Sequence, residues 1–168
     1  MISGLWEPVL GSIQKPKAGE LLFIPQKPYM LLGSLREQLC YPTEVTKFSD
    51  EHLVAVLDEV NLSSLIDRYP NLDIKQDWPR ILSLGEQQRL AFARLLLNSP
   101  RFAVLDEATS ALDIATEKRL YNLLRERELS LISVGHRPSL KDFHENILEL
   151  NGKGNWKLFT SDKYNFKN

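Results

Sequence analysis

The 168-residue sequence predicts a single α/β domain built around a mostly parallel sheet. Two apolar runs, "FAVLDE" at 102–107 and "LSLISVGH" at 129–136, are typical of buried strands. Segments with helical spacing of apolar residues lie before and between these runs. Strands that alternate with helices in this way usually pair in parallel, with the helices packed on the sheet.

The first half of the chain predicts one strand and three helices. The strand is "ELLFIPQ" at 20–26, and a short helix with Ser34 as its N-cap follows at 33–42. Residues 49–62 place apolar side chains on one helical stripe, with Ser49 or Asp50 as the cap. A further short helix is expected at 63–68.

The second half continues the alternation. The expected elements are a helix at 85–97, a strand at 102–107, a helix at 114–128, a strand at 129–136 and two strands joined by a turn at 151–155.

Composition excludes some classes of function. The net charge is −1, which gives no general attraction to nucleic acid or to anionic membranes, so we expect no nucleic-acid partner. Cys40 is the one cysteine, so no intrachain disulfide can form. No apolar run approaches the 18 residues that suggest a membrane span. Trp6, Trp78 and Trp156 are expected to be packing anchors.

The turn "LSLGE" at 82–86 supports two interpretations. Ser83 followed three residues later by Glu86 has the spacing of a capping box, which would only start a helix. Alternatively, Ser83, Gly85 and the free amides of the helix start could bind an anion, since glycine allows a phosphate close to the backbone. These residues alone leave both interpretations open.

Two acids, Asp106 and Glu107, close the strand at 102–107. Ligands of open α/β sheets bind beyond the carboxyl ends of the strands. One carboxylate there could hold Mg²⁺, while its neighbour orients or deprotonates a water molecule. The alternative is that the pair caps the following helix.

Four segments in register carry a family resemblance. The family is the ATP-binding cassette (ABC) family. Its signature motif is resembled by "LSLGEQQRLAFAR", and its Walker B strand with D-loop by "FAVLDEATSALD". Its Q-loop is resembled by "FIPQKPYMLLGSLREQL", and its H-loop by "ISVGHR". They span roughly residues 20 to 137, and their amino-acid sequences are most similar to those of the half-transporters of subfamily D. The resemblance implies part of a P-loop NTPase fold with a helical signature subdomain.

The resemblance also implies domain boundaries. Residues 1–160 would be the C-terminal portion of a nucleotide-binding domain and 161–168 a tail. Within it would lie the Q-loop region at 20–40, the helical subdomain at about 34–97, the Walker B strand with D-loop at 102–113 and the H-loop at 133–137.

In this family two domains pair head to tail with ATP and Mg²⁺ between them, which implies a role for each matching residue. Nucleotide held by the opposite domain would be contacted by Ser83, Gly85 and Glu86. Asp106 would bind Mg²⁺, Glu107 would be the base for the hydrolytic water, and Gln26 would sense Mg²⁺ or water. Asp113 would lie at the dimer interface, and His136 would contact the γ-phosphate. Without the shared register, Gln26 would be a surface loop residue and His136 a strand-end histidine.

The implied partners are another ABC nucleotide-binding domain and the transmembrane domain of a transporter. The chain would therefore be associated with a membrane through that transporter and would face the cytosol or stroma.

The glycine loop G-x-x-x-x-G-K-[ST] of such a site is missing from the sequence. The one Gly-Lys pair is Gly152-Lys153, with Ile147 and Gly154 where the first glycine and the hydroxyl residue belong. We expect the chain to start near the end of the helix that this loop opens. It should then bind ATP weakly or not at all alone. It should also lack a strand beside 102–107, and hence be marginally stable, self-associating or partner-dependent.

Three functional interpretations remain open from the sequence. The chain could be the C-terminal portion of a transporter ATPase, or a non-hydrolysing partner that donates its signature motif in trans to an intact domain. It could also be an inactive remnant.

Overall fold

A computed structural model describes residues 11–17, 19–151 and 154–166. Trp6 lies outside these residues. The strands are β1 Leu21–Ile24, β2 Gly33–Ser34, β3 Lys75–Gln76, β4 Phe102–Asp106, β5 Ser130–Val134, β6 Asn146–Leu150 and β7 Trp156–Thr160. The helices are α1 Leu35–Cys40, α2 Asp50–Glu59, α3 Ser63–Arg68, α4 Trp78–Ile81, α5 Leu84–Asn98 and α6 Ile114–Glu126. Short 3-10 turns are η1 Val45–Lys47, η2 Pro138–Phe143 and η3 Ser161–Lys163.

The central sheet has the order β1-β4-β5, and all three strands are parallel. Leu21 lies opposite Phe102, and Phe102 in turn lies opposite Ser130. Two small antiparallel pairs, β2 with β3 and β6 with β7, stand apart from this sheet. The predicted α/β class with a parallel sheet is confirmed.

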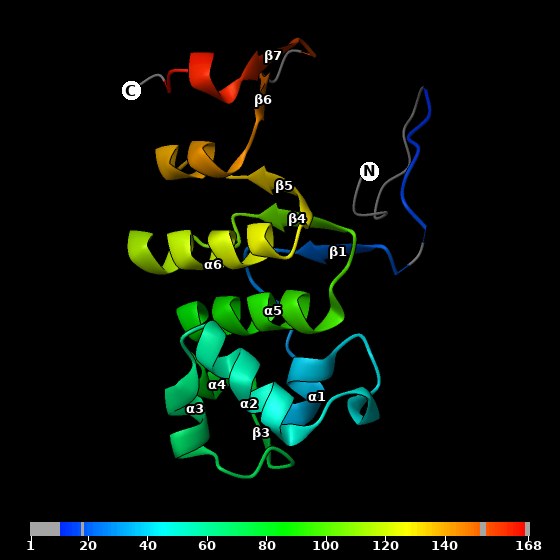
Figure 1. The fold of residues 1–168 in the computed structure, drawn as a ribbon, viewed down its shortest axis with the longest axis vertical. Coiled ribbons are helices and arrows are strands. Elements are labelled where there is room, and N and C mark those ends of the chain that lie inside the picture. Colours follow the sequence, from blue (N-terminus) through cyan, green and yellow to red (C-terminus); the bar gives the residue numbers. More distant parts are fainter. Residues whose placement is uncertain (1–10, 18, 152–153, 167–168) are drawn as a thin grey trace.

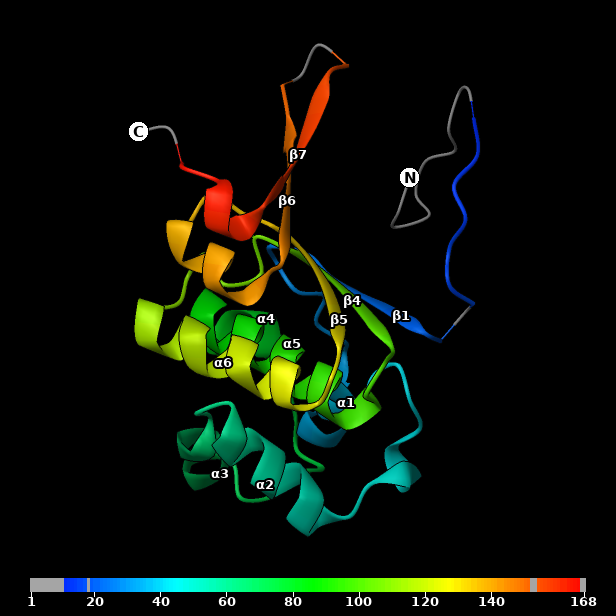
Figure 2. The same ribbon diagram turned by 45° about the horizontal axis from the view of Figure 1, so that its top comes forward.

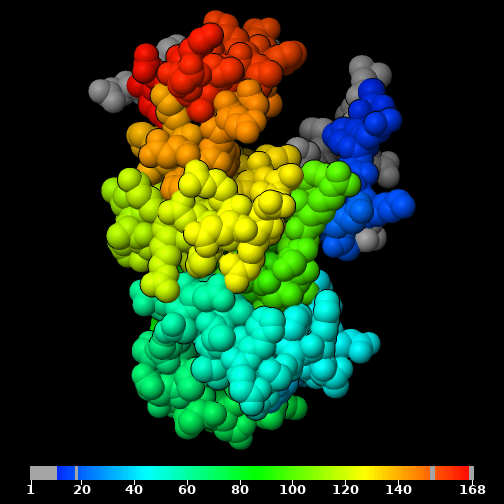
Figure 3. Space-filling view, in the orientation of Figure 1, coloured from blue at the N-terminus to red at the C-terminus, as the bar shows by residue number. Residues whose placement is uncertain are grey.

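The molecule is layered around α5. Helices α5 and α6 lie along one face of the sheet, and α1 to α4 lie on the far side of α5 (Figures 1 and 2). The β6–β7 hairpin with η3 forms a separate lobe at the opposite end, coloured orange to red in Figure 3. No helix in the described residues is long and apolar enough to cross a membrane.

The helices begin where local hydrogen bonds favour a start. Ser34 accepts a hydrogen bond from the amide of Glu37, whose carboxylate accepts from the amide of Ser34, so α1 opens with a complete capping box. Ser49, rather than Asp50, caps α2. The predicted stripe of α2 is buried, as expected for an amphipathic helix packed on α5.

One continuous core joins the helical part to the sheet. Trp78 is fully buried within it, as expected, and so is Cys40. The indole Nε1 of Trp78 donates to the carbonyl of Gly33 at 2.8 Å, and Tyr69 packs edge-on against the ring. The expectation for Trp156 is wrong: it is 66% exposed, because it lies on the projecting β6–β7 hairpin rather than under a helix.

The expected open edge beside residues 102–107 is also wrong. Strand β4 pairs on both sides, with β1 and with β5. Within the described residues β1 and β5 are the edge strands, each with a neighbour on one side only. The prediction that β5 is buried fails as well, because Ile132 and Val134 are 50% and 53% exposed on the face away from α6. The alternate residue Ser133 contacts Tyr121 of α6.

This exposed edge predicts self-association. An open strand with apolar side chains can pair with another copy, and lysine on such a strand opposes pairing. We expect Ile132→Lys combined with Val134→Lys to shift the chain toward monomer in sedimentation velocity. Val54→Lys, at a 40% exposed position on α2, is the control and should leave the distribution unchanged. Equal association of the wild type and the double variant would contradict the prediction.

Candidate functional site

The carboxyl ends of the three parallel strands bring the predicted catalytic residues to one edge of the sheet. Gln26 follows β1 by two residues, Glu107 follows β4 directly, and His136 follows β5 by two residues. The strands run in the same direction and in register, so these positions lie at the same edge of the sheet.

Glu107 is the centre of this group. Gln26 Nε2 donates to Glu107 Oε2 at 2.7 Å, and His136 Nε2 lies 3.1 Å from Glu107 Oε1. The Glu107 side chain is 30% exposed, whereas that of His136 is 90% exposed and accessible to a ligand. The structure thus brings together the three residues predicted to be catalytic.

The backbone of Glu107 is unusual. Its φ is +48°, in the left-handed region that residues with a side chain rarely adopt. The amide of Glu107 donates to the carbonyl of Val134 at 2.8 Å, which extends the β4–β5 ladder by one residue. This turn directs the carboxylate toward Gln26 and His136, and strained conformations of this kind cluster at functional sites.

Asp106 is the last residue of β4, opposite Val134 of β5, and is half-buried. No group of three or more His, Cys, Asp and Glu side chains in the described part of the chain has the arrangement of a metal centre. A site with few protein ligands suits Mg²⁺, which usually binds one or two carboxylates and keeps several waters.

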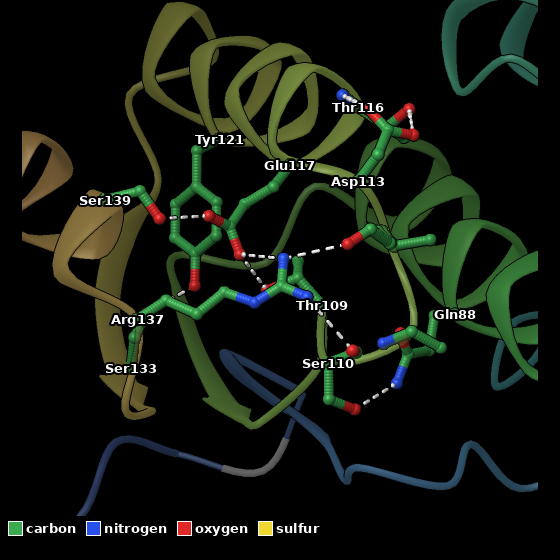
Figure 4. A network of polar contacts seen from close by, with 12 residues as sticks. Gln88, Thr109, Ser110, Asp113, Thr116, Glu117, Tyr121, Ser133, Arg137 and Ser139 are labelled. Atoms are coloured by element: carbon green, nitrogen blue, oxygen red, sulfur yellow. Dashed lines mark hydrogen bonds and ion pairs between the residues drawn. The ribbon is translucent and has the colours of Figure 1, made fainter.

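The alternative that Asp106 and Glu107 cap the next helix is excluded. The N-cap of α6 is Asp113, which accepts hydrogen bonds from the amide and the hydroxyl of Thr116 at 2.8 and 2.7 Å. These bonds lower the pKa of Asp113 below its ordinary value, so its carboxylate is charged at neutral pH. Asp113 is exposed at the start of α6 (Figure 4).

The start of α5 has the predicted capping box. Ser83 Oγ accepts from the amide of Glu86 at 3.2 Å, and Glu86 Oε2 accepts from the amide and the hydroxyl of Ser83, both at 2.9 Å. Arg68 forms an ion pair with the same carboxylate. Burial would raise the pKa of Glu86, but the bonds from Ser83 and the charge of Arg68 outweigh it, and the net shift is downward.

Gly85 has a packing role that the sequence did not indicate. A Cβ at this position would lie 3.2 Å from the carbonyl oxygen of Ala111 and 3.5 Å from Leu112 Cδ2. The loop after β4 therefore approaches the helix start closely, and a Cβ at residue 85 would need this loop to shift by a few tenths of an ångström. Glycine thus favours close contact within the chain at this position.

The structure does not join the two predicted parts of the site directly. No hydrogen bond or ion pair among the described residues links the helix start at 83–86 to Gln26, Glu107 or His136. The head-to-tail arrangement of two domains that the resemblance implies stays a prediction.

Sequence reasoning missed three polar residues behind the site, Gln88, Glu117 and Arg137. Gln88 and Glu117 are fully buried, and Arg137 forms an ion pair with Glu117 at 3.3 Å (Figure 4). A signal was present for Glu117, because it falls on the apolar stripe of α6 with Leu120 and Leu124. A charge at such a position indicates a buried polar network.

Tyr121 at the edge of this network predicts alkaline destabilisation. It is 2% exposed, stacks on Phe143 and shares a 2.9 Å hydrogen bond with Ser133. Burial raises its pKa to about 12. The neutral phenol thus contributes stability below pH ~10 that is lost as the pH rises toward 12, by roughly 2–3 kcal/mol.

Urea unfolding between pH 9 and 11.5 checks this prediction. The free energy of unfolding of the wild type should fall more steeply with pH than that of Tyr121→Phe, which has no ionisable group at this position. Parallel pH profiles for the two proteins would show that Tyr121 is not responsible.

Comparisons with known proteins agree with this fold. A family model described as ABC transporter matches residues 1–110. An uncharacterized ABC transporter ATP-binding protein of Synechocystis is 49% identical over 94% of the chain and 24% of its own length. The lysosomal cobalamin transporter ABCD4 of Mus musculus is 45% identical over 94% of the chain and 28% of its own length.

Further relatives point the same way. Human ATP-binding cassette sub-family D member 3 is 41% identical over 99% of the chain and 26% of its own length. A bacterial Atm1-family ABC exporter, solved with ATP bound, superposes with a TM-score of 0.67 at 28% identity, over 79% of the chain and 24% of that structure. The chain spans about a quarter of the length of these relatives.

The fold and the strand-end residues define an α/β domain of the ABC ATPase type. The chain belongs to the ABC transporter family, and its relatives include transporters of subfamily D.

Proposed function

We propose that this chain is part of the ATP-hydrolysing domain of an ABC transporter and acts only when paired with a second nucleotide-binding domain. ATP and Mg²⁺ would lie between the two. Glu107 would take a proton from the attacking water, Gln26 would orient that water or contact Mg²⁺, and His136 would contact the γ-phosphate. Asp106 would bind Mg²⁺, and Asp113 would lie at the interface between the two domains. Nucleotide held by the other domain would be contacted by Ser83, Gly85 and Glu86.

The observation that carries the proposal is the double contact at Glu107. A carboxylate that accepts from Gln26 and lies beside His136 is held in one orientation by groups from two other strands. A general base must be held within hydrogen-bond reach of the proton that it removes. The exposure of His136 leaves it free to contact a phosphate at the same place.

The residues present fit Mg²⁺. Because the Gln26 amide nitrogen faces Glu107, its carbonyl oxygen faces away from that carboxylate and can act as a ligand. Together with the Asp106 carboxylate it would supply two hard oxygen ligands, while phosphate oxygens and waters would supply the rest. The ion would neutralise charge on the phosphates, which the two acids alone would repel.

The helix start of α5 supports a role toward a partner. The helix is 15 residues long and opens with free amides behind Ser83. Such a terminus favours an anion. The capping carboxylate of Glu86 is neutralised by Arg68, so it opposes a nearby phosphate less than a free acid would.

The whole assembly is also part of the proposal. The relatives are transporters by name, which supports attachment to a membrane through a transmembrane domain, with this chain facing the cytosol or stroma. The division into a Q-loop region, a helical subdomain and the Walker B, D-loop and H-loop segments follows the same resemblance.

Calorimetric titration tests the dependence on a partner. No segment of these 168 residues fits the lysine-bearing glycine loop. We therefore expect no binding of ATP–Mg²⁺ by the isolated chain in the micromolar range. Micromolar affinity of the isolated chain would contradict this part of the proposal.

A second candidate function is donation of the signature motif in trans by a chain that does not itself hydrolyse ATP. The complete capping box at Ser83 favours it, because this half of the site is formed within the chain. The test mixes the chain with an intact ABC nucleotide-binding domain whose own signature serine has been replaced.

ATP hydrolysis by that mixture should then depend on Ser83 of this chain. Ser83→Arg should abolish it, and Ser64→Arg, at an exposed position on α3, should not. Under pure donation, Glu107→Gln in this chain leaves hydrolysis unchanged. A loss with Glu107→Gln shows that this chain's own carboxylate takes part.

A further inference from the structure

The loop between β4 and α6 is held from two opposite sides by side chains of other elements. This loop, residues 107–113, begins with Glu107 and ends with Asp113. Its central part, residues 109–112, has two backbone carbonyls, one backbone amide and one hydroxyl bonded to Gln88 or Arg137. Figure 4 shows Ser110 between these two side chains.

Gln88 of α5 holds the first side. It is fully buried, and its Nε2 donates to the carbonyl of Gln26 at 2.9 Å and to Ser110 Oγ at 3.0 Å. Its Oε1 accepts from the amide of Ala111 at 3.0 Å. One amide group thus uses both of its donor hydrogens and its acceptor to tie the end of β1 to the loop.

Arg137 holds the second side, and it directly follows His136. Its Nη1 donates to the carbonyl of Leu112 at 2.8 Å, and its Nη2 donates to the carbonyl of Ser110 at 3.0 Å. The buried carboxylate of Glu117, which also accepts from Thr109 Oγ1 at 2.6 Å, lies 3.3 Å from Arg137 Nη1. The position of the loop therefore depends on the segment that carries His136.

Ser110 is the point where the two sides meet. Its hydroxyl bonds Gln88 and its carbonyl bonds Arg137, so a displacement of the loop acts on both side chains at once. Gln88 and Glu117, which anchor the two sides, are fully buried and hydrogen-bonded, and such satisfied polar groups favour a single geometry. The network ends on one side at the backbone carbonyl of Gln26 and on the other at Arg137, the chain neighbour of His136. Gln26 and His136 are the two residues that contact Glu107.

We propose that Gln88 and Arg137 are positioning residues that couple residues 109–112 to Gln26 and His136, and so set the orientation of both relative to Glu107. The catalytic consequence rests on the proposed function, but the coupling itself does not. A partner that contacts the exposed Asp113 at the end of this loop would then act on Glu107 through Ser110.

Nuclear magnetic resonance on the full chain without nucleotide tests the coupling. Gln88→Met removes the side-chain amide and keeps a side chain of similar length. Arg137→Lys keeps the positive charge but lacks the two guanidinium nitrogens that bond two backbone carbonyls. Arg119→Lys is the matched control, because Arg119 also donates to two backbone carbonyls, those of Asp58 and Glu59, away from the site.

Two readouts are expected to change. The Ala111 amide should exchange with solvent roughly tenfold faster in Gln88→Met, since its acceptor is lost. The His136 ring signals should also shift, although Gln88 does not bond His136. In Arg137→Lys the side-chain amide signals of Gln26 should shift, and Arg119→Lys should leave all of these signals unchanged.

A milder variant guards against loss of folding. Ser110 is exposed, and Ser110→Ala removes only the hydroxyl bonded to Gln88, so it should shift the same signals by less. If each variant changes only the signals beside it, Gln88 and Arg137 are independent local anchors and the proposal is wrong. These measurements need no ATP hydrolysis, so failure of the coupling and failure of the proposed function are separate outcomes.

Discussion

Glu107→Gln is expected to lower ATP hydrolysis on the order of 10²–10⁴-fold in an assembly in which a glycine loop and this chain form one site. Such an assembly can be made by fusing the corresponding N-terminal segment of the Synechocystis relative ahead of this chain. The glutamine has the same shape and its oxygen can still accept the hydrogen bond from Gln26, but it cannot accept a proton from water.

The affinity for ATP separates this effect from misfolding. It should stay unchanged in Glu107→Gln, because only the turnover number depends on the base. Glu44→Gln, at an exposed position, is the control and should behave like the wild type. Retention of more than about a tenth of the activity in Glu107→Gln would show that another group activates the water.

Trp78→Ala is expected to destabilise the fold by roughly 3–5 kcal/mol. The indole is fully buried, packs against Tyr69 and bonds Gly33, so its removal leaves a cavity and an unpaired carbonyl. Trp78→Phe keeps most of the apolar contact and loses the hydrogen bond, which is worth about 1 kcal/mol.

Urea unfolding followed by circular dichroism gives both values. The difference between the two variants isolates the contribution of the cavity from that of the hydrogen bond. If the two variants lose equal stability, the hydrogen bond to Gly33 rather than the packing dominates at this position.

The helices could be predicted closely because their signals are local. The short helix expected at 63–68 is α3, Ser63–Arg68, and Ser34 and Ser83 cap the helices that they were expected to start. A cap and an apolar stripe involve residues three or four positions apart, which a single sequence displays.

Strand neighbours could not be predicted in the same way. The apolar runs at 102–107 and 129–136 look alike, yet β4 lies between two strands and β5 has a neighbour on one side only in the described part of the chain. Pairing depends on residues far apart in sequence. The serine at 133 among apolar neighbours was the one local hint that the two faces of β5 differ.

The same limit applies to the site. Gln26, Glu107 and His136 could be placed together because each follows a predicted strand. Gln88 could not, because a glutamine on a helix usually faces water, and its partner Gln26 is 62 positions away. The close approach of Gly85 to Ala111 could not be predicted either, because it depends on a loop distant in sequence, and the ligand role of Gly85 stays a prediction.

The left-handed backbone at residue 107 implies a conflict between the thermal stability of the fold and its catalytic activity. Glycine adopts that conformation without the cost of roughly 1–2 kcal/mol that an L side chain carries. Laboratory evolution of this chain toward heat resistance alone would therefore favour the loss of its carboxylate. Only screening for turnover at the same time would keep a glutamate there.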